Sequence, residues 1–333
     1  ADADRVIDAS GKAVIPGFVD PHTHALFAGD RSDEFAAKLR GKTYQEILAE
    51  GGGILRTVAA VREASDERLR ENLRSQLDVM LAHGTTTVEV KTGYGLDTET
   101  ELRMLEAIAA VDETHPVDVV PTFLGAHAVP ADVEQSAYVE HVIEDQLPAV
   151  ADQGIARYVD VFCEEGVFTV EESRRILEAG RDHGLGVKIH AEEFAHLGGA
   201  RLAAELGATS ADHLLQADEV DAAALAGSGV VPVLLPGTAF SLGAEFADPA
   251  LFEDAGSEVA LATDFNPNCH SQSMQFAVTL GCVEMGMAPE DALVAATRNA
   301  ALALDRTDGL GTLQPGTPAD AVVLDAPSYV DVP

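Results

Sequence analysis

Two histidines one residue apart stand at the end of an apolar segment, in Pro21-His22-Thr23-His24. Residues i and i+2 of an extended strand point to the same side, so both imidazoles would project together. Two neutral imidazoles at this spacing supply half of a metal site. Because His-x-His also occurs on ordinary protein surfaces, the pair is identified as a ligand pair only by further donors elsewhere in the chain.

Three more segments place a ligand-type residue where a predicted strand stops, at His190, His213 and Asp264. Four such strand ends out of eight form a pattern of nitrogen and oxygen donors with one position left for water, which is typical of a hydrolytic metal centre. Taken singly, each residue also has a structural interpretation. His190 and His213 would then be buried, hydrogen-bonded histidines, and Asp264 would cap a helix.

Short β-branched segments alternate with helical patterns along the chain. We predict strands over residues 13–24, 85–93, 118–127, 158–164, 186–190, 209–213, 230–235 and 259–264. Helices are predicted over residues 66–81, 97–111, 169–183, 195–206 and 289–304. This alternation favours an α/β fold of the parallel (β/α)₈ TIM type, whose active site lies at the carboxyl ends of the strands. A doubly wound open sheet is the alternative, but no Gly-x-Gly-x-x-Gly follows the first strand to support it.

The length of 333 residues fits two domains or one large barrel. We assign residues 13–307 to the barrel. Residues 1–12 and 308–333 contain strand-like pieces, and we expect them to form part of a small β-sandwich domain that joins the two ends of the chain. Because so few residues precede the first predicted strand, we expect this composite domain to be incomplete.

The chain carries 21 basic and 56 acidic residues, which give a formal net charge of −35. A phosphate backbone would be repelled by this charge, so nucleic acid is a poor partner. The acidic residues are spread along a lysine-poor chain, as in proteins of salt-loving organisms. No apolar run approaches the roughly 20 residues of a membrane span, and the first residues lack a signal-peptide pattern. Three scattered cysteines indicate a reducing cytoplasm.

Several motifs resemble the amidohydrolase superfamily. The superfamily features are Val14-Ile-Pro-Gly-Phe-Val-Asp-Pro-His-Thr-His24, the later His190, His213 and Asp264, and the closing Gly316-Thr-Pro-Ala-Asp320. Within the superfamily, the chain is similar to the imidazolonepropionase family. The motifs that carry this closer resemblance are Glu89-Val-Lys-Thr-Gly-Tyr-Gly95, Phe123-Leu-Gly-Ala-His127, His190-Ala-Glu-Glu-Phe194 and Asp264-Phe-Asn-Pro267.

The resemblance implies hydrolysis of the cyclic amide 4-imidazolone-5-propanoate to N-formimidoyl-L-glutamate, a step of histidine degradation. It also implies one divalent metal ion, zinc or iron. The implied metal ligands are His22, His24, His190 and Asp264. A metal lowers the pKa of a bound water to about 7, which makes hydroxide available at neutral pH.

The resemblance also assigns roles to residues around the metal. The implied catalytic residues are Glu193, His213 and Asp264. Glu193 would take a proton from the water, with Glu192 as the alternative base, and His213 would polarise the ring carbonyl or shuttle a proton. The positions that match substrate contacts are Arg31, Tyr94, His127 and Asn266. A guanidinium suits the propionate group of the substrate because its fork binds a carboxylate in a bidentate manner.

Two features set this chain apart from the family pattern. Asn268 and Cys269 stand where many members have glycine and then serine or threonine, so we count both as altered substrate contacts. Relatives with two metals use a lysine on the fourth barrel strand. Residues 158–164 contain no lysine, which favours one metal, and Glu164 at the end of that strand is the remaining candidate for a second site.

Two other functions stay open. Another amidohydrolase, such as a heterocycle deaminase or a different cyclic amidase, would use the same metal site. A deaminase of neutral bases would not need the carboxylate clamp suggested by Arg31 and Tyr94. A non-catalytic metal-binding protein would need neither Glu193 nor His213. Relatives are usually dimeric, so we expect a homodimer that acts on a small molecule.

Overall fold

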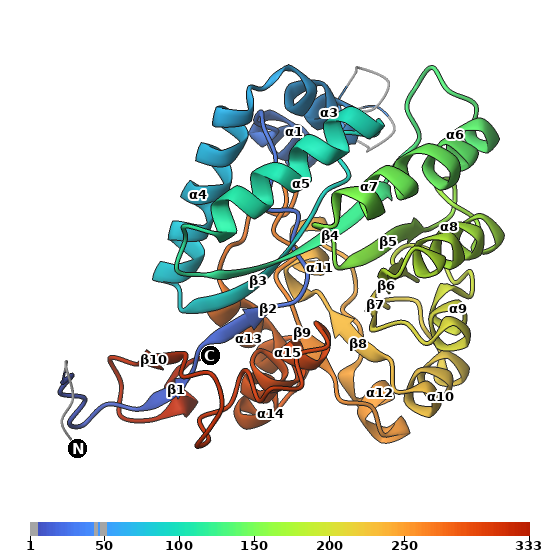
Figure 1. The fold of residues 1–333 in the computed structure, drawn as a ribbon. Coiled ribbons are helices and arrows are strands. Elements are labelled where there is room, and N and C mark those ends of the chain that lie inside the picture. The colour runs from blue at the N-terminus through green and yellow to red at the C-terminus, as the bar shows by residue number, and fades with distance from the viewer. Residues whose placement is uncertain (1–5, 43–45, 47–51) are drawn as a thin grey trace.

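Eight parallel strands form one sheet that curls into a nearly closed barrel in the computed structural model of the chain, which describes residues 6–42, 46 and 52–333 (Figure 1). Neighbours in the sheet follow one another along the chain. The strands are β2 (Phe18–Asp20), β3 (Thr85–Lys91), β4 (Asp118–Ala126), β5 (Tyr158–Cys163), β6 (Gly186–Ala191), β7 (Ser210–His213), β8 (Val231–Leu234) and β9 (Ala260–Leu261). A parallel bridge between Thr23 and Phe265 joins the exits of β2 and β9, so the sheet closes at the carboxyl ends of its strands. The (β/α)₈ prediction is confirmed.

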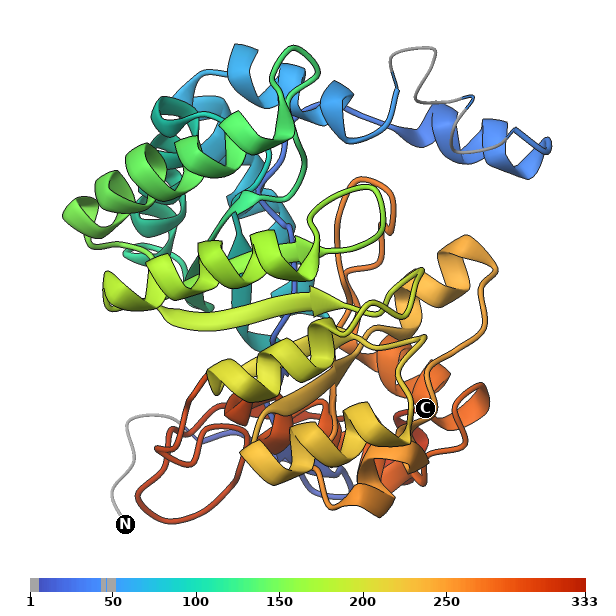
Figure 2. The same ribbon diagram turned by 90° about the vertical axis from the view of Figure 1, so that its right-hand side faces the viewer.

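Helices connect the strands and lie on the outside of the barrel (Figures 1 and 2). They are α1 (Ser32–Leu39), α3 (Ile54–Glu63), α4 (Asp66–Ala82), α5 (Thr98–Asp112), α6 (Gln135–His141), the π-helical turn η1 (Val142–Gln146), α7 (Leu147–Gln153), α8 (Val170–Asp182), α9 (Gly199–Leu206), α10 (Glu219–Ser228), α11 (Pro236–Leu242), α12 (Pro249–Ala255), α13 (Met274–Val283), α14 (Pro289–Ala295), α15 (Arg298–Leu302) and the 3₁₀ turn η2 (Tyr329–Asp331). Within the described part of the chain, no helix has both the length and the apolar character needed to cross a membrane.

Caps and apolar stripes explain where the long helices form. α4 begins after Ser65, whose side chain accepts a hydrogen bond from a backbone N–H of the first turn, and it buries Leu69, Leu73 and Leu77 on one face. α8 begins with a capping box at Thr169, as the sequence predicts. These local signals agree with the barrel topology, so the helices lie where the alternating pattern places them.

The predicted helix over residues 289–304 is two helices, α14 and α15. The break falls at Thr297, whose backbone leaves the helical region (φ −132°, ψ −88°). The Thr297 hydroxyl donates to the Leu293 carbonyl oxygen at 2.7 Å, which is the local side-chain bond by which threonine competes with helical pairing. A continuous apolar pattern concealed this break.

The predicted first strand over residues 13–24 is also divided. Its start is β1 (Val14–Pro16), which pairs in an antiparallel manner with β10 (Ala321–Val323). The chain then turns at Gly17 into the barrel, where a Cβ atom would lie only 2.2 Å from Thr86 Oγ1, so only glycine fits. The two ends of the chain thus meet in a two-stranded sheet, which lies at the end of the molecule opposite α1 (Figure 1). A β-sandwich domain over residues 1–12 and 308–333 stays a prediction, and residues 1–5 lie outside the described ones.

Candidate metal centre and active site

The carboxyl ends of four barrel strands bring the predicted ligands to one point. Asp264 Oδ1 lies 3.7 Å from His22 Nε2 and 3.6 Å from His24 Nε2. His24 Nε2 lies 3.4 Å from His190 Nε2. Donor atoms of His22, His190 and His213 also lie within 4.8 Å of one another. The side chains of all five residues are nearly inaccessible to solvent.

His22 is oriented by a carboxylate. Its Nδ1 lies 2.6 Å from Asp212 Oδ2, and the hydroxyl of Ser210 donates to Asp212 Oδ1 at 2.6 Å. The Asp212 carboxylate accepts a hydrogen bond from His22 Nδ1–H, so the neutral ring directs the lone pair of Nε2 toward Asp264. His22 Nε2 is buried and has no hydrogen-bond partner among the described residues. A buried acceptor without a donor is costly, and a metal ion would satisfy it.

Asp264 is oriented from both of its oxygen atoms. Thr238, in the first turn of α11, donates through its hydroxyl to Oδ2, and Asn266 donates through its Nδ2 to Oδ1 at 3.0 Å. Oδ1 is the oxygen atom that also faces His22 and His24. Asp264 has φ +50° and His213 has φ +82°, a backbone region that side chains other than glycine rarely adopt. Strain of this kind concentrates at functional sites.

The chemistry of these donors fits a divalent metal ion. Burial, reinforced by neighbouring imidazoles, lowers the pKa values of His22, His24 and His213 well below the usual range of histidine. The rings are therefore neutral, as metal ligands must be. Imidazole nitrogens with one carboxylate oxygen form a donor set suited to zinc or iron.

A layer of fully buried charges inside the barrel adjoins the histidines. Lys91 Nζ lies 2.8 Å from Glu89 Oε2 and 2.8 Å from Asp160 Oδ2. Asp160 Oδ2 in turn lies 3.0 Å from His190 Nδ1. Burial alone would raise the pKa of Asp160, but His190 and Lys91 hold it well below its usual range. Lys188 completes the layer, 2.9 Å from Glu89. Two of the four histidines thus have a carboxylate at the ring nitrogen that faces away from the centre.

Glu193 lies at the edge of the cluster, with its Oε2 3.7 Å from His213 Nε2. Burial, with smaller contributions from Asp264 and Glu164, raises the pKa of Glu193 well above its usual range. Glu192 is different, because its carboxylate accepts hydrogen bonds from four backbone N–H groups, of residues 197–200, at 2.5–3.2 Å. The carboxylate of Glu192 holds the start of α9, which leaves Glu193 as the residue suited to proton transfer.

Tyr94 and His127 form an aromatic wall beside the histidines. The His127 ring stacks on His24 with a centroid distance of 4.8 Å, and the Tyr94 ring lies 5.3 Å from His127. His127 Nδ1 lies 3.1 Å from the Gly93 carbonyl oxygen, to which it donates, so Nε2 is an acceptor. Burial and the nearby His190 lower the pKa of His127 to about 3, so the ring is neutral.

Arg31, which precedes α1, and Asn266, two residues after Asp264, are both already bonded within the chain. Arg31 donates through Nε to Glu34 Oε2 at 2.9 Å, and its Nη2 lies 2.9 Å from the same oxygen. Asn266 Oδ1 accepts from the backbone N–H groups of Asn268 and Cys269. Asn266 therefore shapes the turn that carries Asp264, whatever contact it makes with a substrate.

Asn268 and Cys269, which stand where the family pattern has small residues, point in different directions. The Asn268 side chain accepts a hydrogen bond from Lys38 of α1. The Cys269 side chain is buried, with its sulfur 3.7 Å from the Thr263 carbonyl oxygen, and burial raises its pKa to about 12. Cys269 is thus a packed thiol.

Glu164 is occupied by backbone groups. Its Oε2 accepts from Phe194 N at 2.9 Å and its Oε1 from Glu165 N at 2.7 Å. β5 carries no lysine, and its charged residue is Asp160. Both oxygens of Glu164 thus accept backbone hydrogen bonds that fix the side chain at the end of β5.

The buried charged residues that support the histidines were missed in the sequence. Asp160, Asp212, Glu89, Lys91 and Lys188 are fully buried in the barrel. A signal was available, because charged residues inside apolar strand segments, two positions apart as in Glu89-Val-Lys91, predict side chains that point into the barrel.

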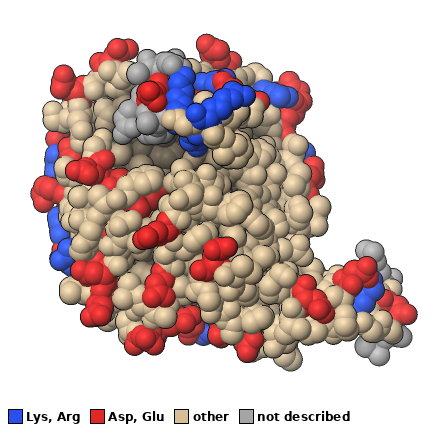
Figure 3. All heavy atoms as spheres, turned by 180° about the vertical axis from the view of Figure 1, so that it is seen from behind, with Lys and Arg blue, Asp and Glu red and all other residues tan. Residues whose placement is uncertain are grey.

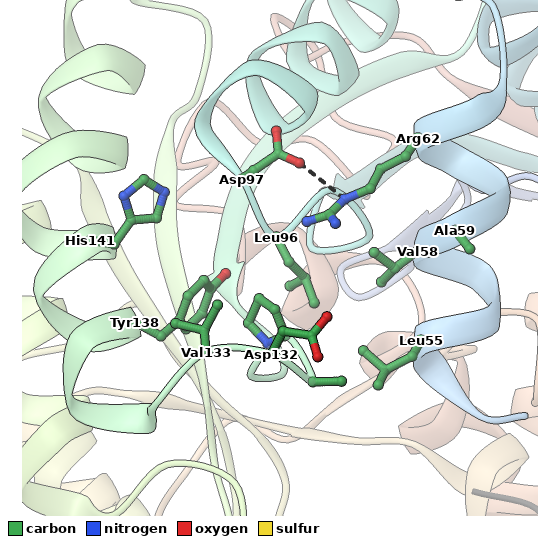
Figure 4. A pocket seen from close by; sticks show the side chains of 12 residues that line it. Leu55, Val58, Ala59, Arg62, Leu96, Asp97, Asp132, Val133, Tyr138 and His141 are labelled. Carbon is green, nitrogen blue, oxygen red and sulfur yellow. Dashed lines mark ion pairs between the residues drawn. The ribbon is translucent and has the colours of Figure 1, made fainter. Parts of the chain in front are cut away.

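A separate cavity of about 460 Å³ lies between α3 and α6 (Figure 4). Its wall is mostly apolar, from residues such as Leu55, Val58 and Tyr138. An ion pair of 3.0 Å between Arg62 and Asp97 lies at its edge. None of the metal-ligand candidates lines this cavity, so it is distinct from the cluster described above.

Comparisons with known proteins agree with this geometry. The profile of the amidohydrolase family matches residues 13–332. The imidazolonepropionase of Haloarcula marismortui is 67% identical over 331 residues, which cover 99% of this chain and 79% of that protein. The imidazolonepropionase of Halobacterium salinarum is 69% identical over 337 residues, which cover 99% and 81%. The crystal structure of 5-methylcytosine deaminase from Klebsiella pneumoniae liganded with 5-fluorocytosine covers all of this chain and 85% of its own, with a TM-score of 0.78 at 19% identity.

A (β/α)₈ barrel with histidines and an aspartate at its carboxyl end is the architecture of a hydrolase, and the chain belongs to the amidohydrolase family. Within that family, the relatives at 49–69% identity over nearly the whole chain are imidazolonepropionases. The relatives from Haloarcula marismortui and Halobacterium salinarum fit the predicted adaptation to salt. The deaminase likeness, at 19% identity, concerns the fold alone.

Proposed function

We propose that the protein hydrolyses 4-imidazolone-5-propanoate to N-formimidoyl-L-glutamate, with one divalent metal ion, zinc or iron, at the histidine cluster. The observation that carries this proposal is the convergence of Asp264 Oδ1 with the Nε2 atoms of His22 and His24, beside His190. The identity of up to 69% with imidazolonepropionases supports the substrate.

The ligands we propose are His22, His24, His190 and Asp264. A metal bound there supplies a Lewis acid, which makes water acidic enough to deprotonate at neutral pH. Asp212 and Asp160 hold the rings of His22 and His190 by the distal ring nitrogens. Such outer carboxylates fix the tautomer of a ligand histidine and increase its basicity.

Glu193 is the proposed proton carrier. Its carboxylate takes a proton from water as the oxygen attacks the ring carbonyl carbon. It then returns the proton to the ring nitrogen as the carbon–nitrogen bond breaks. Burial raises the pKa of Glu193, which makes its carboxylate a stronger proton acceptor than an exposed one. We assign the polarisation of the carbonyl oxygen to His213, and the distance of 3.7 Å between its Nε2 and Glu193 Oε2 supports this role.

The substrate would lie against Tyr94 and His127, whose rings form the wall next to His24. Arg31 and Asn266 are the proposed contacts at the rim. A heterocycle deaminase is the second candidate within the family, but the deaminase structure that resembles this chain is 19% identical and supports the fold alone. The oligomer we propose is a homodimer, which sedimentation velocity tests directly.

The test is turnover of freshly generated 4-imidazolone-5-propanoate in high salt, followed by loss of the imidazolone chromophore. The same preparation is assayed after chelation and again after zinc or iron is restored. The expected result is metal-dependent loss of the chromophore with formation of formimidoylglutamate. A folded, metal-loaded sample without turnover would overturn the proposed substrate and leave another heterocycle as the target.

A further inference from the structure

α1 brings two cations to the rim of the site, and they differ in how their charges are balanced. Arg31 forms an ion pair with Glu34 at 2.9 Å. Lys38, in the last turn of α1, donates through Nζ to Asn268 Oδ1, which belongs to a neutral amide. Among the described residues, no carboxylate forms an ion pair with Lys38. Among the described residues, Lys38 thus lacks the direct ion-pair partner that Arg31 has, and Glu34 acts on it only from a distance.

The position of Lys38 is tied to the metal-ligand candidates by hydrogen bonds. Asn268 N donates to Asn266 Oδ1 at 2.7 Å, and Asn266 Nδ2 donates to Asp264 Oδ1 at 3.0 Å. Lys38 thus connects to Asp264 through two asparagines. A glycine at position 268 would offer no side-chain acceptor, so the residue that departs from the family pattern is the one that holds this lysine.

The ammonium group lies in a place that is unfavourable without an anion. Lys38 is half-buried, and burial, with the nearby Arg31, lowers its pKa. An ammonium ion has three N–H donors, and Asn268 accepts from one of them. Two donors remain for an anionic ligand, which would restore the solvation that burial removes.

Lys38 is one of few lysines in a strongly acidic chain. The chain has five lysines against 56 acidic residues. Lys91 and Lys188 are buried against carboxylates, and Lys12 pairs with Asp325 at 2.7 Å. Figure 3 shows Asp and Glu scattered over one face of the molecule, whereas Lys and Arg gather at the edge beside a hollow, at the end of the molecule where α1 lies. A local positive region on an acidic protein attracts anionic ligands.

We propose that Lys38 binds the carboxylate side chain of the ring substrate, with Asn268 as the residue that positions its ammonium group. This inference rests on the proposed function for the identity of the ring. It adds that the ammonium group of Lys38 binds the carboxylate of the substrate side chain. Arg31, whose charge Glu34 already balances, acts beside Lys38 and not alone. The site thereby selects heterocycles that carry an acidic side chain over neutral ones.

The test compares Lys38→Met with Lys38→Arg and with Arg40→Met, all in zinc-loaded protein in 1 M KCl. Arg40 is an exposed cation just after the same helix, so its removal changes the net charge equally. Calorimetry measures the binding of two inert probes: imidazole propionate, which has the acidic tail, and 4-methylimidazole, which lacks it. Steady-state assays on the imidazolone give KM and kcat separately.

We expect Lys38→Met to weaken imidazole propionate binding by about 10- to 100-fold, the range for a lost hydrogen bond between charged groups. KM should rise far more than kcat falls. Lys38→Arg should recover part of the loss, and 4-methylimidazole should bind all variants alike. Arg40→Met should bind both probes as the wild-type protein does. Asn268→Gly should weaken imidazole propionate binding by a smaller factor than Lys38→Met.

Equal losses in Lys38→Met and Arg40→Met would overturn the proposal in favour of general electrostatic attraction. Equal losses for both probes would overturn it in favour of a structural role. If the wild-type protein binds imidazole propionate through Lys38 but does not turn over the imidazolone, the proposed function fails and this inference stands. If the wild-type protein binds neither probe, both fail.

Discussion

His22 Nδ1 lies 2.6 Å from Asp212 Oδ2, inside the barrel and away from solvent. This contact decides which ring nitrogen of His22 carries its proton, and therefore which one faces Asp264. The two residues come from β7 and from the segment after β2, so the tautomer of a ligand at one strand end is set by another strand of the barrel. Asp160 stands in the same relation to His190.

Asp212→Asn should weaken metal binding about 10- to 100-fold, because the amide can donate to His22 Nδ1 and so favour the wrong tautomer. Chelator competition followed by metal analysis measures the affinity. Asp78→Asn is the matched control, since Asp78 pairs with His115 at 3.3 Å on the surface. Equal metal affinity in the two variants would show that Asp212 does not tune the ligand.

His213→Ala should lower kcat by about 10³-fold, the scale expected for lost proton transfer or carbonyl polarisation. Metal content, measured by inductively coupled plasma mass spectrometry, should stay at one ion per chain. Donor atoms of His213, His22 and His190 lie close enough together to share one metal ion, so loss of metal in this variant would also be informative. If metal and activity are lost together, His213 is a ligand.

Glu193→Gln and Glu192→Gln should separate catalysis from stability. Glu193→Gln should lower kcat by about 10²- to 10⁴-fold with little change in melting temperature. Glu192→Gln should lower the melting temperature, because its carboxylate holds four backbone N–H groups at the start of α9. Thermal unfolding and steady-state kinetics on both variants provide the comparison. A stable but inactive Glu192→Gln protein would reverse the assignment.

Asp20→Asn should stabilise the protein at high pH. Burial, outweighing hydrogen bonds from Thr263, raises the pKa of Asp20 to about 7, against about 3.9 in an unfolded chain. Between these values the folded state holds a proton that the unfolded state has lost, so stability falls as pH rises from 4 to 7. The gain in melting temperature from Asp20→Asn should therefore be about 3 °C or more at pH 8 and small at pH 4. The same gain at both pH values would mean that Asp20 does not titrate in this range.

Low salt should destabilise the fold. A net charge of −35 repels itself, and the screening length increases from about 3 Å at 1 M salt to about 10 Å at 0.1 M. The melting temperature should rise steadily with KCl over this range. Sucrose at matched osmolality is the control, because it acts by exclusion and does not screen charge. A melting temperature independent of KCl would contradict the prediction.

The sequence predicted those features of the fold and the site that depend on local residue patterns. The alternation of β-branched and helical segments predicted the barrel, and the apolar segment before His22 and His24 placed both residues at a strand end. The break at Thr297 and the division of the first strand at Gly17 depend on tertiary contacts, which a continuous apolar pattern does not reveal. The same holds for Glu192, whose role depends on the loop that folds over it.

The closure of the barrel has a consequence for biosynthesis. Asp20 and Thr263, whose side chains join the first and last strand exits, are 243 residues apart in the sequence, and His22 and Asp212 are 190 apart. Translation at about 5–20 residues per second separates the appearance of such partners by roughly 10–50 s. For that time the nascent chain carries the two histidines of its first strand without the aspartate that orients one of them. Lys91 of β3 is likewise synthesised 69 residues before Asp160, so this buried charge leaves the ribosome before one of its carboxylate partners exists.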